Sequence, residues 1–420
     1  MKRILIEKKG WMIVFCILPV IFLLIGGPSR AIAQNTIKIG VLECFRGTSE
    51  YFSREWYNSV KFAVEERNEK GGLLGKKIEL IPVDHEMKPE IAVRKAKKLL
   101  LEDKVEFLFV GMASHICIAL NKIAPTYKKI FLYYGGVADS ITGSEFSRYA
   151  FRATINSHTF SLGVAKYMSS KPFRRYYFLN PDYAMGHDIA RTFKENLKVY
   201  VPEAKIVGED YHPLGTKEYA PYIEKVVASH ADAIFTGTFG TDFIYLMKQA
   251  RSLGLKSPFP FVTYVNPDPI LMEQLKEDAV GMTSVHIYSM AVDTPENKRF
   301  VARFHEKNKD NKNPCERWPR ESGAIPALAV PMLFAAVEKA NSLDTEKIIE
   351  AFEGFWYKTP VGWWEMRKCD HTLVAPLYSS EVVSGPNPYY DHPWLGPNVY
   401  KVDGMEASIP PTSKYNPRCY

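Results

Sequence analysis

The chain has 420 residues, of which 46% are hydrophobic and 24% are charged. This balance is typical of a globular protein with sizeable cores and two or three domains, and it excludes a mainly disordered chain. The formal net charge is +7, and residues 1–33 carry +4 of it because they hold five Lys or Arg residues and one Glu. The rest of the chain is nearly balanced and has no basic stripe interleaved with aromatic residues, which argues against nucleic-acid binding.

Residues 1–33 have the pattern of an export signal. A basic stretch at 2–9 precedes an apolar core at 11–25, and helix-breaking glycines and a proline follow at 26–28. A small-x-small triplet ends at Ala33, so we expect cleavage after Ala33 and release of the mature protein into the periplasm. The alternative is an uncleaved anchor, although the apolar core is short for a bilayer.

From residue 35 onward, short apolar runs alternate with helical patterns. The first series of predicted strands lies at 37–42, 78–83, 105–110 and 130–134, with helices at 54–70, 89–102 and up to residue 120. A second series has strands at 175–179, 204–207, 231–236, 259–265 and 280–287, with helices at 187–197, 219–227 and 242–253. Such alternation indicates parallel sheets with right-handed crossovers. We therefore predict an α/β protein with two doubly wound parallel-sheet lobes and a crevice between them.

The remaining segment adds three predicted helices and a β-rich tail. The helices lie at 295–307, 324–341 and 345–353, and Trp, Tyr, Gly and Pro dominate after residue 355. We expect a hinge of three crossings, near 153–156, 284–288 and 355–362. The predicted parts are a signal peptide at 1–33, lobe one at 35–154 plus 287–356, lobe two at 155–286 plus 357–400, and a loosely ordered tail at 401–420.

Several motifs in this order resemble the branched-chain amino acid (leucine/isoleucine/valine-type) periplasmic binding proteins of ABC importers. The matching stretches are IKIGV at 37–41, NEKGGLLG at 68–75, VGMAS at 110–114, NPDYAMG at 180–186, GTD at 240–242 and MRKCDH at 366–371. Departures occur in the first loop at 43–46, at His115 and in a tail that is longer than usual. These departures concern the ligand more than the fold.

The resemblance implies the type I periplasmic-binding-protein fold and a non-enzymatic function. We expect an exported solute-binding protein that captures an amino acid, an amide or a small carboxylate by hinge closure. Its partner would be an ABC permease in the inner membrane, and the protein itself would be a monomer without a cofactor. The alternatives are a ligand-binding sensor subunit of a signalling system and a secreted hydrolase that uses carboxylates such as Glu43 and Asp242.

Candidate ligand contacts follow the predicted strands, because ligands bind beyond the carboxyl ends of parallel strands. Ser114 follows the strand at 105–110 and opens a helix, so its hydroxyl and the nearby N–H groups suit a carboxylate, although an ordinary helix cap has the same pattern. Asp242 suits a ligand ammonium group or, equally, a helix cap. The complete set of expected contacts is Ala113, Ser114, Ala138, Asp139, Tyr183, Phe239, Asp242 and Tyr264, with Arg46 and Tyr51 from the first loop.

The alternatives for these residues are structural. The glycine pair before Ala138 also fits a tight turn, and Tyr183 also fits a surface loop. For Arg46 and Tyr51, a solvated Arg and a packed Tyr are somewhat favoured. The resemblance implies that Ser114 and the backbone of Ala113 take the ligand's carboxylate and that Tyr183 hydrogen-bonds or stacks on the ligand.

The mature chain has five cysteines, and no pair of them has metal-ligand spacing. Cys44 and Cys117 lie beside apolar strands and are expected to be free core residues. We predict a disulfide between Cys315 and Cys369, since both lie in loop-rich sequence of an exported protein. The His residues lack ligand spacing, so no metal site is expected.

Overall fold

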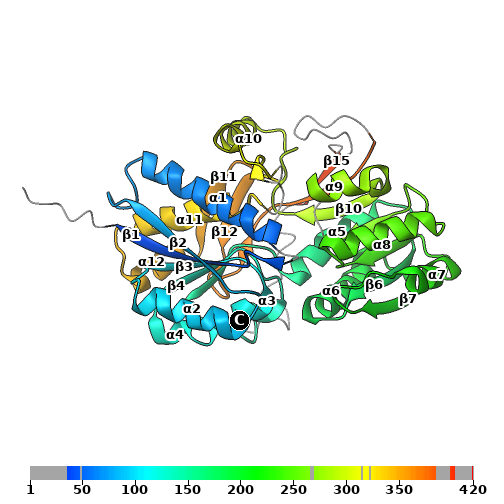
Figure 1. Ribbon diagram of the computed structural model, residues 1–420, viewed down its shortest axis with the longest axis horizontal. Coiled ribbons are helices and arrows are strands. Elements are labelled where there is room, and N and C mark those ends of the chain that lie inside the picture. Colours follow the sequence, from blue (N-terminus) through cyan, green and yellow to red (C-terminus); the bar gives the residue numbers. More distant parts are fainter. Residues whose placement is uncertain are drawn as a thin grey trace, which may run out of the picture. The chain divides into compact units, whose positions relative to one another are not determined.

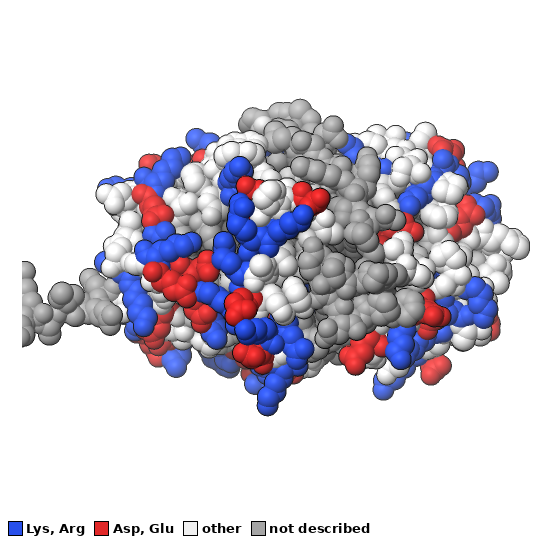
Figure 2. All heavy atoms as spheres, turned by 90° about the horizontal axis from the view of Figure 1, so that it is seen from above, with Lys and Arg blue, Asp and Glu red and all other residues white. Residues whose placement is uncertain are grey.

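The computed structural model describes residues 36–47, 50–264, 269–313, 316–320, 323–384, 398–402 and 419. The expected signal peptide at 1–33 lies outside these residues. None of the helices within the described ranges is both long and apolar enough to span a bilayer. Figure 2 shows Lys and Arg side chains interspersed with Asp and Glu on the face that it displays.

The first sheet is entirely parallel, with the strand order β2-β1-β3-β4-β5. Its strands are β1 (Ile37–Glu43), β2 (Ile78–Asp84), β3 (Phe107–Val110), β4 (Ile130–Tyr133) and β5 (Ala150–Arg152). Every residue of β3 and β4 is buried, as expected for central strands that are covered by helices on both faces. The helices of this lobe are α1 (Glu50–Glu69), α2 (Pro89–Leu101), α3 (Ser114–Asn121), α4 (Ala124–Tyr127), α11 (Ile325–Ala340) and α12 (Thr345–Phe352) (Figure 1).

The second sheet repeats the same winding. Its parallel strands are β6 (Arg175–Pro181), β7 (Lys205–His212), β8 (Ala233–Thr236), β9 (Phe261–Thr263) and β10 (Met282–His286), in the order β10-β9-β8-β6-β7. The antiparallel strands β14 (Leu377–Glu381) and β15 (Asn398–Val402) extend it beyond β10. The helices of this lobe are α5 (Ser157–Ser169), α6 (Ala184–Tyr200), α7 (Ala220–Ala228), α8 (Gly240–Ser252) and α9 (Pro269–Leu275). Each sheet therefore has the same doubly wound order, which is the predicted fold class.

The expected boundary of lobe two at residue 357 is wrong. Strands β11 (Phe355–Thr359), β12 (Gly362–Met366) and β13 (Leu373–Val374) form a separate antiparallel sheet, and β11 packs on α11 of the first lobe. The segment before β13 also joins the first sheet, because Arg152 N donates to His371 O at 2.9 Å. The chain therefore passes to the second sheet at residues 375–376 and not near 355–362. The inward side chains of β12 explain this placement, since Trp364 and Met366 are fully buried.

The chain also crosses between the sheets at two earlier places. The first sheet ends with β5, and α5 packs on α6 of the second lobe. After β10 comes α10 (Pro295–Asn308), whose Phe304 contacts Phe62 of α1 with ring centroids 4.9 Å apart.

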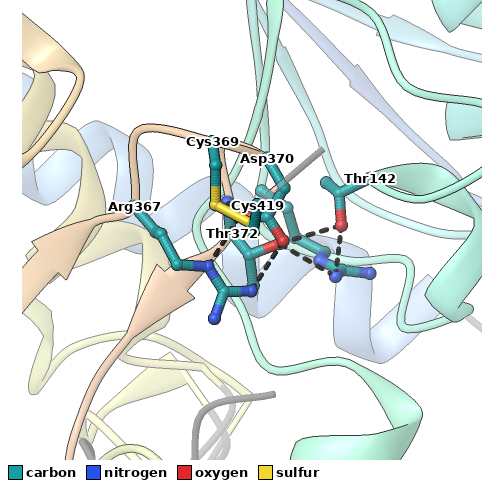
Figure 3. The surroundings of a disulfide bond; sticks show 7 residues. Thr142, Arg367, Cys369, Asp370, Thr372 and Cys419 are labelled. Carbon is teal, nitrogen blue, oxygen red and sulfur yellow. Dashed lines mark hydrogen bonds and ion pairs between the residues drawn. A yellow bond between two sulfur atoms is a disulfide. The ribbon is translucent and has the colours of Figure 1, made fainter. Parts of the chain in front are cut away.

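The predicted Cys315–Cys369 disulfide is wrong, because Cys369 is bonded to Cys419. The two Cα atoms are 5.0 Å apart, and Cys369 lies in the turn between β12 and β13, beside Asp370 and Thr372 (Figure 3). Tertiary proximity decides this pairing, and Cys315 lies outside the described residues. Cys44 and Cys117 are free and buried, which confirms that expectation.

Only three residues of the expected loosely ordered tail at 401–420 are described. Residues 401–402 belong to β15, which pairs with β14, and Cys419 is held by the disulfide. The other residues of 401–420 lie outside the described part of the chain.

Candidate functional site

A cavity of about 810 Å³ lies at the carboxyl ends of strands from both parallel sheets. The first sheet contributes residues that follow β3 and β4, and the second contributes residues that follow β6, β8 and β9 or end β10. In each sheet the first strand along the chain lies beside the third, β1 beside β3 and β6 beside β8. The connections that leave these two neighbouring strands run in opposite directions along the sheet, and open parallel sheets form a crevice at such a position. The volume suits a small organic molecule.

Most of the predicted contact residues meet at this cavity. The lining includes Ala113, Ser114, Ala138, Asp139, Tyr183, Phe239 and Tyr264. Their side chains come from loops that are far apart in sequence, and both lobes are represented. The cavity therefore offers one ligand contacts to both lobes.

Three predicted residues do not line the cavity. The Asp242 carboxylate accepts a hydrogen bond from Gly215 N at 2.7 Å, so it holds a neighbouring loop of the second lobe. Arg46 is exposed and forms an ion pair with Asp84 at 2.6 Å. The ring of Tyr51 lies against the ring of Phe52, with centroids 4.1 Å apart.

Ser114 is placed at the first turn of α3 with a defined hydrogen-bonding pattern. Its Oγ accepts from the backbone N–H groups of Val137 and Ala138, at 3.1 Å each. The hydroxyl donates to no described residue, so its proton is available to an acceptor in the cavity. Ser114 thus ties the two loops of the first lobe together and presents a donor to a ligand.

The loop after β4 can lie this close because of its glycines. A Cβ on Gly135 would lie 2.6 Å from the carbonyl oxygen of Gly111, and Gly136 has a φ of +83°. Only glycine fits both the close backbone approach and the left-handed conformation without strain. The glycine pair therefore allows Val137 and Ala138 to reach Ser114.

The buried Arg152 holds the loop after β4 by hydrogen bonds. Arg152 donates to Ala138 O at 2.9 Å and to Thr142 Oγ1 at 2.5 Å. Burial lowers the pKa of Arg152 to about 10, which leaves it charged at neutral pH. Burial alone would raise the pKa of Asp370, but hydrogen bonds from Arg367 hold it below its ordinary value. Figure 3 shows Thr142, Arg367 and Asp370 around the Cys369–Cys419 disulfide, which lies outside the cavity lining.

An ion pair joins the two lobes at the cavity wall. Arg191 of α6 lies 3.3 Å from Asp139 of the first lobe and 3.1 Å from Asp188 of its own helix. The other carboxylate oxygen of Asp139 accepts from His158 N at 3.2 Å. Burial raises the pKa of Asp139 above its ordinary value. Arg191 was not predicted as a site residue, because it lies within a helix and not in a loop at a strand end.

A buried carboxyl group contacts the lining residue Tyr134. Glu43 is fully buried and accepts a hydrogen bond from the Tyr134 hydroxyl at 2.7 Å. Burial raises the pKa of Glu43 to about 8, so the group is mostly neutral at pH 7. Neither Glu43 nor Asp242 lines the cavity, so the two carboxylates considered for a hydrolase do not meet there.

The structure adds lining residues that the sequence did not single out for this role. They are mainly apolar or aromatic and include Phe52, Trp56, Met112, Tyr134, Met185, His286 and Ile325. Phe52 and Trp56 belong to α1, where helical spacing indicates only a buried face. His286 ends β10, and burial lowers its pKa to about 3, so it adds no charge.

One group of potential metal-binding side chains occurs in the described ranges. It consists of Cys369, Asp370 and Cys419. Both sulfur atoms of this group are bonded to each other, so they are not thiolate ligands.

Comparisons with known proteins give a consistent picture. A model of the periplasmic binding protein family matches residues 36–386. The Leu/Ile/Val-binding protein homolog 4 of Brucella melitensis is 25% identical over 372 residues, which cover 85% of this chain and 86% of that protein. The leucine-, isoleucine-, valine-, threonine-, and alanine-binding protein of Pseudomonas aeruginosa is 24% identical over 350 residues, covering 80% of this chain and 87% of that protein.

Solved structures share the fold. The closed form of the leucine-, isoleucine-, valine-, threonine-, and alanine-binding protein of Brucella ovis has a TM-score of 0.79 and 22% identity, and the match covers 89% of this chain and 97% of that one. A solute-binding protein of an ABC transporter from Rhodopseudomonas palustris BisB5, in complex with 3,4-dihydroxybenzoic acid, has a TM-score of 0.74 and 22% identity over 88% of this chain and 98% of that one.

Proposed function

Since this chain belongs to the periplasmic binding protein family, in the branch of the branched-chain amino acid binding proteins of ABC transporters, we propose that it is a solute-binding protein that hands its ligand to an ABC importer. The ligand is an amino acid, an amide or a small carboxylate. The protein makes and breaks no covalent bond. It is exported with a signal peptide that is cleaved after Ala33, and it works in the periplasm as a monomer.

The observation that supports this proposal is the cavity that is lined from both sheets. A ligand that contacts Ser114 of the first lobe and Tyr183 of the second lobe has more contacts when the lobes are closed than when they are apart. Differential contact of this kind shifts a hinge equilibrium toward the closed state. A permease that recognises the closed state then receives loaded protein.

A thermal-shift screen tests ligand binding. Purified mature protein is heated with amino acids, amides and small carboxylates in turn. A ligand at 100 times its dissociation constant stabilises the folded state by about 2.7 kcal/mol, which raises the melting temperature visibly. The proposal fails if no compound of these three classes stabilises the wild type.

Delivery to an importer needs a separate measurement. Uptake of the radiolabelled ligand is compared between cells with the gene, cells without it, and cells with a Ser114→Ala copy. We expect uptake to fall in the last two. Uptake that is independent of the gene, combined with intact ligand binding in vitro, would contradict the transport function and favour the sensor alternative.

A further inference from the structure

The second lobe offers no carboxylate at the positions where the sequence suggested one. A bound α-amino acid presents an ammonium group, which a protein normally meets with a carboxylate and other acceptors. Asp242, the predicted partner of that group, is turned to Gly215 outside the cavity. The residues that do reach the cavity from the loops after β8 and β9 are Phe239, which has no polar side-chain atom, and Tyr264.

The carboxylates that line the cavity are already engaged. Asp139 and Asp188 are both in contact with Arg191, at 3.3 Å and 3.1 Å. The second oxygen of Asp139 accepts from His158 N. An ammonium group at Asp139 would compete with Arg191 in an ion pair that links the two lobes.

The uncommitted polar groups of the cavity include hydroxyl donors and the neutral ring of His286, whose Nε2 has no partner among the described residues. Ser114 has an available proton, and the hydroxyls of Tyr183 and Tyr264 have no hydrogen-bond partner in the described part of the chain. Burial raises the pKa of Tyr183 and of Tyr264, so both keep their protons at neutral pH. A ligand that accepts hydrogen bonds from these hydroxyls needs one acceptor group that faces the first lobe and another that faces the second lobe.

The walls between these donors are aromatic. The rings that line the cavity are Phe52, Trp56, Tyr134, Tyr183, Phe239 and Tyr264. Tyr183 and Phe239 meet edge to face with centroids 6.4 Å apart, as do Trp56 and Tyr134 at 5.9 Å. Aromatic rings pack on one another in such geometries, so this lining suits a flat apolar body.

We infer that the ligand is an aromatic carboxylate without an ammonium group, and that Phe239 and Tyr264 set this preference. The carboxylate lies at Ser114 and the start of α3, the ring lies between the aromatic walls, and a ring substituent accepts a hydrogen bond from Tyr264. This inference rests on the proposed function and narrows its ligand class.

Matched compounds test the inference by isothermal titration calorimetry. The pairs are 3-phenylpropanoate with L-phenylalanine and 4-methylpentanoate with L-leucine, which differ only by the ammonium group. We expect the compound without the ammonium group to bind at least ten times more tightly in each pair, and 3-phenylpropanoate to bind more tightly than 4-methylpentanoate. Tighter binding of either amino acid, or no binding of the two carboxylates at 1 mM, overturns the inference.

The role of Tyr264 has its own test. Tyr264→Phe keeps the ring and removes the hydroxyl, so it should weaken 3-(4-hydroxyphenyl)propanoate about tenfold and leave 3-phenylpropanoate nearly unchanged. Asp242→Asn is the matched control outside the cavity and should change neither affinity. Equal effects of Tyr264→Phe on the two compounds, or a tenfold loss in Asp242→Asn, would refute the assignment.

These outcomes separate the two levels of the proposal. If L-phenylalanine or L-leucine binds and the carboxylates do not, the solute-binding function stands and the inferred ligand class falls. If no amino acid, amide or small carboxylate binds at all, the proposed function itself falls.

Discussion

Loss of the Cys369–Cys419 disulfide should destabilise the protein by an amount that follows from the length of the loop it closes. The two cysteines are 50 residues apart in sequence. Chain-entropy reasoning for a loop of this length predicts about 4 kcal/mol, because the bond restricts the unfolded chain. The bond also holds Cys419 beside the turn that contains Asp370, so its loss should release Cys419 from the first lobe.

Urea unfolding with and without a reductant measures this contribution. We expect reduction to lower the free energy of unfolding of the wild type by about 4 kcal/mol. The double variant Cys369→Ser, Cys419→Ser should unfold like the reduced wild type and should not respond to the reductant. A wild type whose unfolding is unchanged by reduction, or a double variant that still responds, would refute the reasoning.

Three further predictions concern the cavity and its supports. Ser114→Ala and Tyr183→Ala should each weaken ligand binding ten- to a hundredfold in calorimetry, while circular dichroism shows a folded protein. Ser114→Ala removes a hydrogen bond of about 1.5–3 kcal/mol to the ligand carboxylate, and Tyr183→Ala removes both a hydroxyl donor and an aromatic wall. Arg152→Met should lower the free energy of unfolding by more than about 2 kcal/mol in urea, because buried acceptors lose their donor. The stability of Glu43→Gln relative to the wild type should increase as pH rises from 4.5 to about 8, by up to about 1.4 kcal/mol per pH unit. In this range Glu43 ionises in the unfolded wild type but stays protonated in the folded one, so the wild type loses stability. Equal pH profiles of the two proteins in urea unfolding would contradict this.

The alternation of strands and helices predicted the parallel strands of both sheets except β5 (Ala150–Arg152), because each parallel strand needs a crossover helix and most of the apolar runs are short and regular. The sequence after residue 355 predicts strands but does not say which lobe they join. That choice depends on the burial of Trp364 and Met366 and on the contact of β11 with α11, which no local pattern records. The disulfide was mispredicted for a similar reason, since loop composition does not show that Cys419 comes within 5.0 Å of Cys369, Cα to Cα.

Some cavity residues could be predicted from their place after a strand, and others depend on tertiary contacts. Ser114, Tyr183 and Tyr264 follow strand ends directly, and the topology of parallel sheets alone brings such positions to one edge. Asp242 also comes soon after a strand, but it lies within the first turn of α8 and its side chain holds Gly215. Arg191 lies in the middle of a helix, and its contact with Asp139 depends on how the two lobes meet. Position along a strand is thus readable from sequence, whereas side-chain direction and contacts between lobes are not.

The central claim is that one ligand contacts both lobes and thereby holds them closed. Small-angle X-ray scattering tests it directly, with the compound that gives the largest thermal shift. We predict that saturating ligand reduces the radius of gyration of the wild type, and that the same concentration leaves the double variant Ser114→Ala, Tyr183→Ala unchanged. Tight binding by the wild type with no change in its radius of gyration would contradict the account.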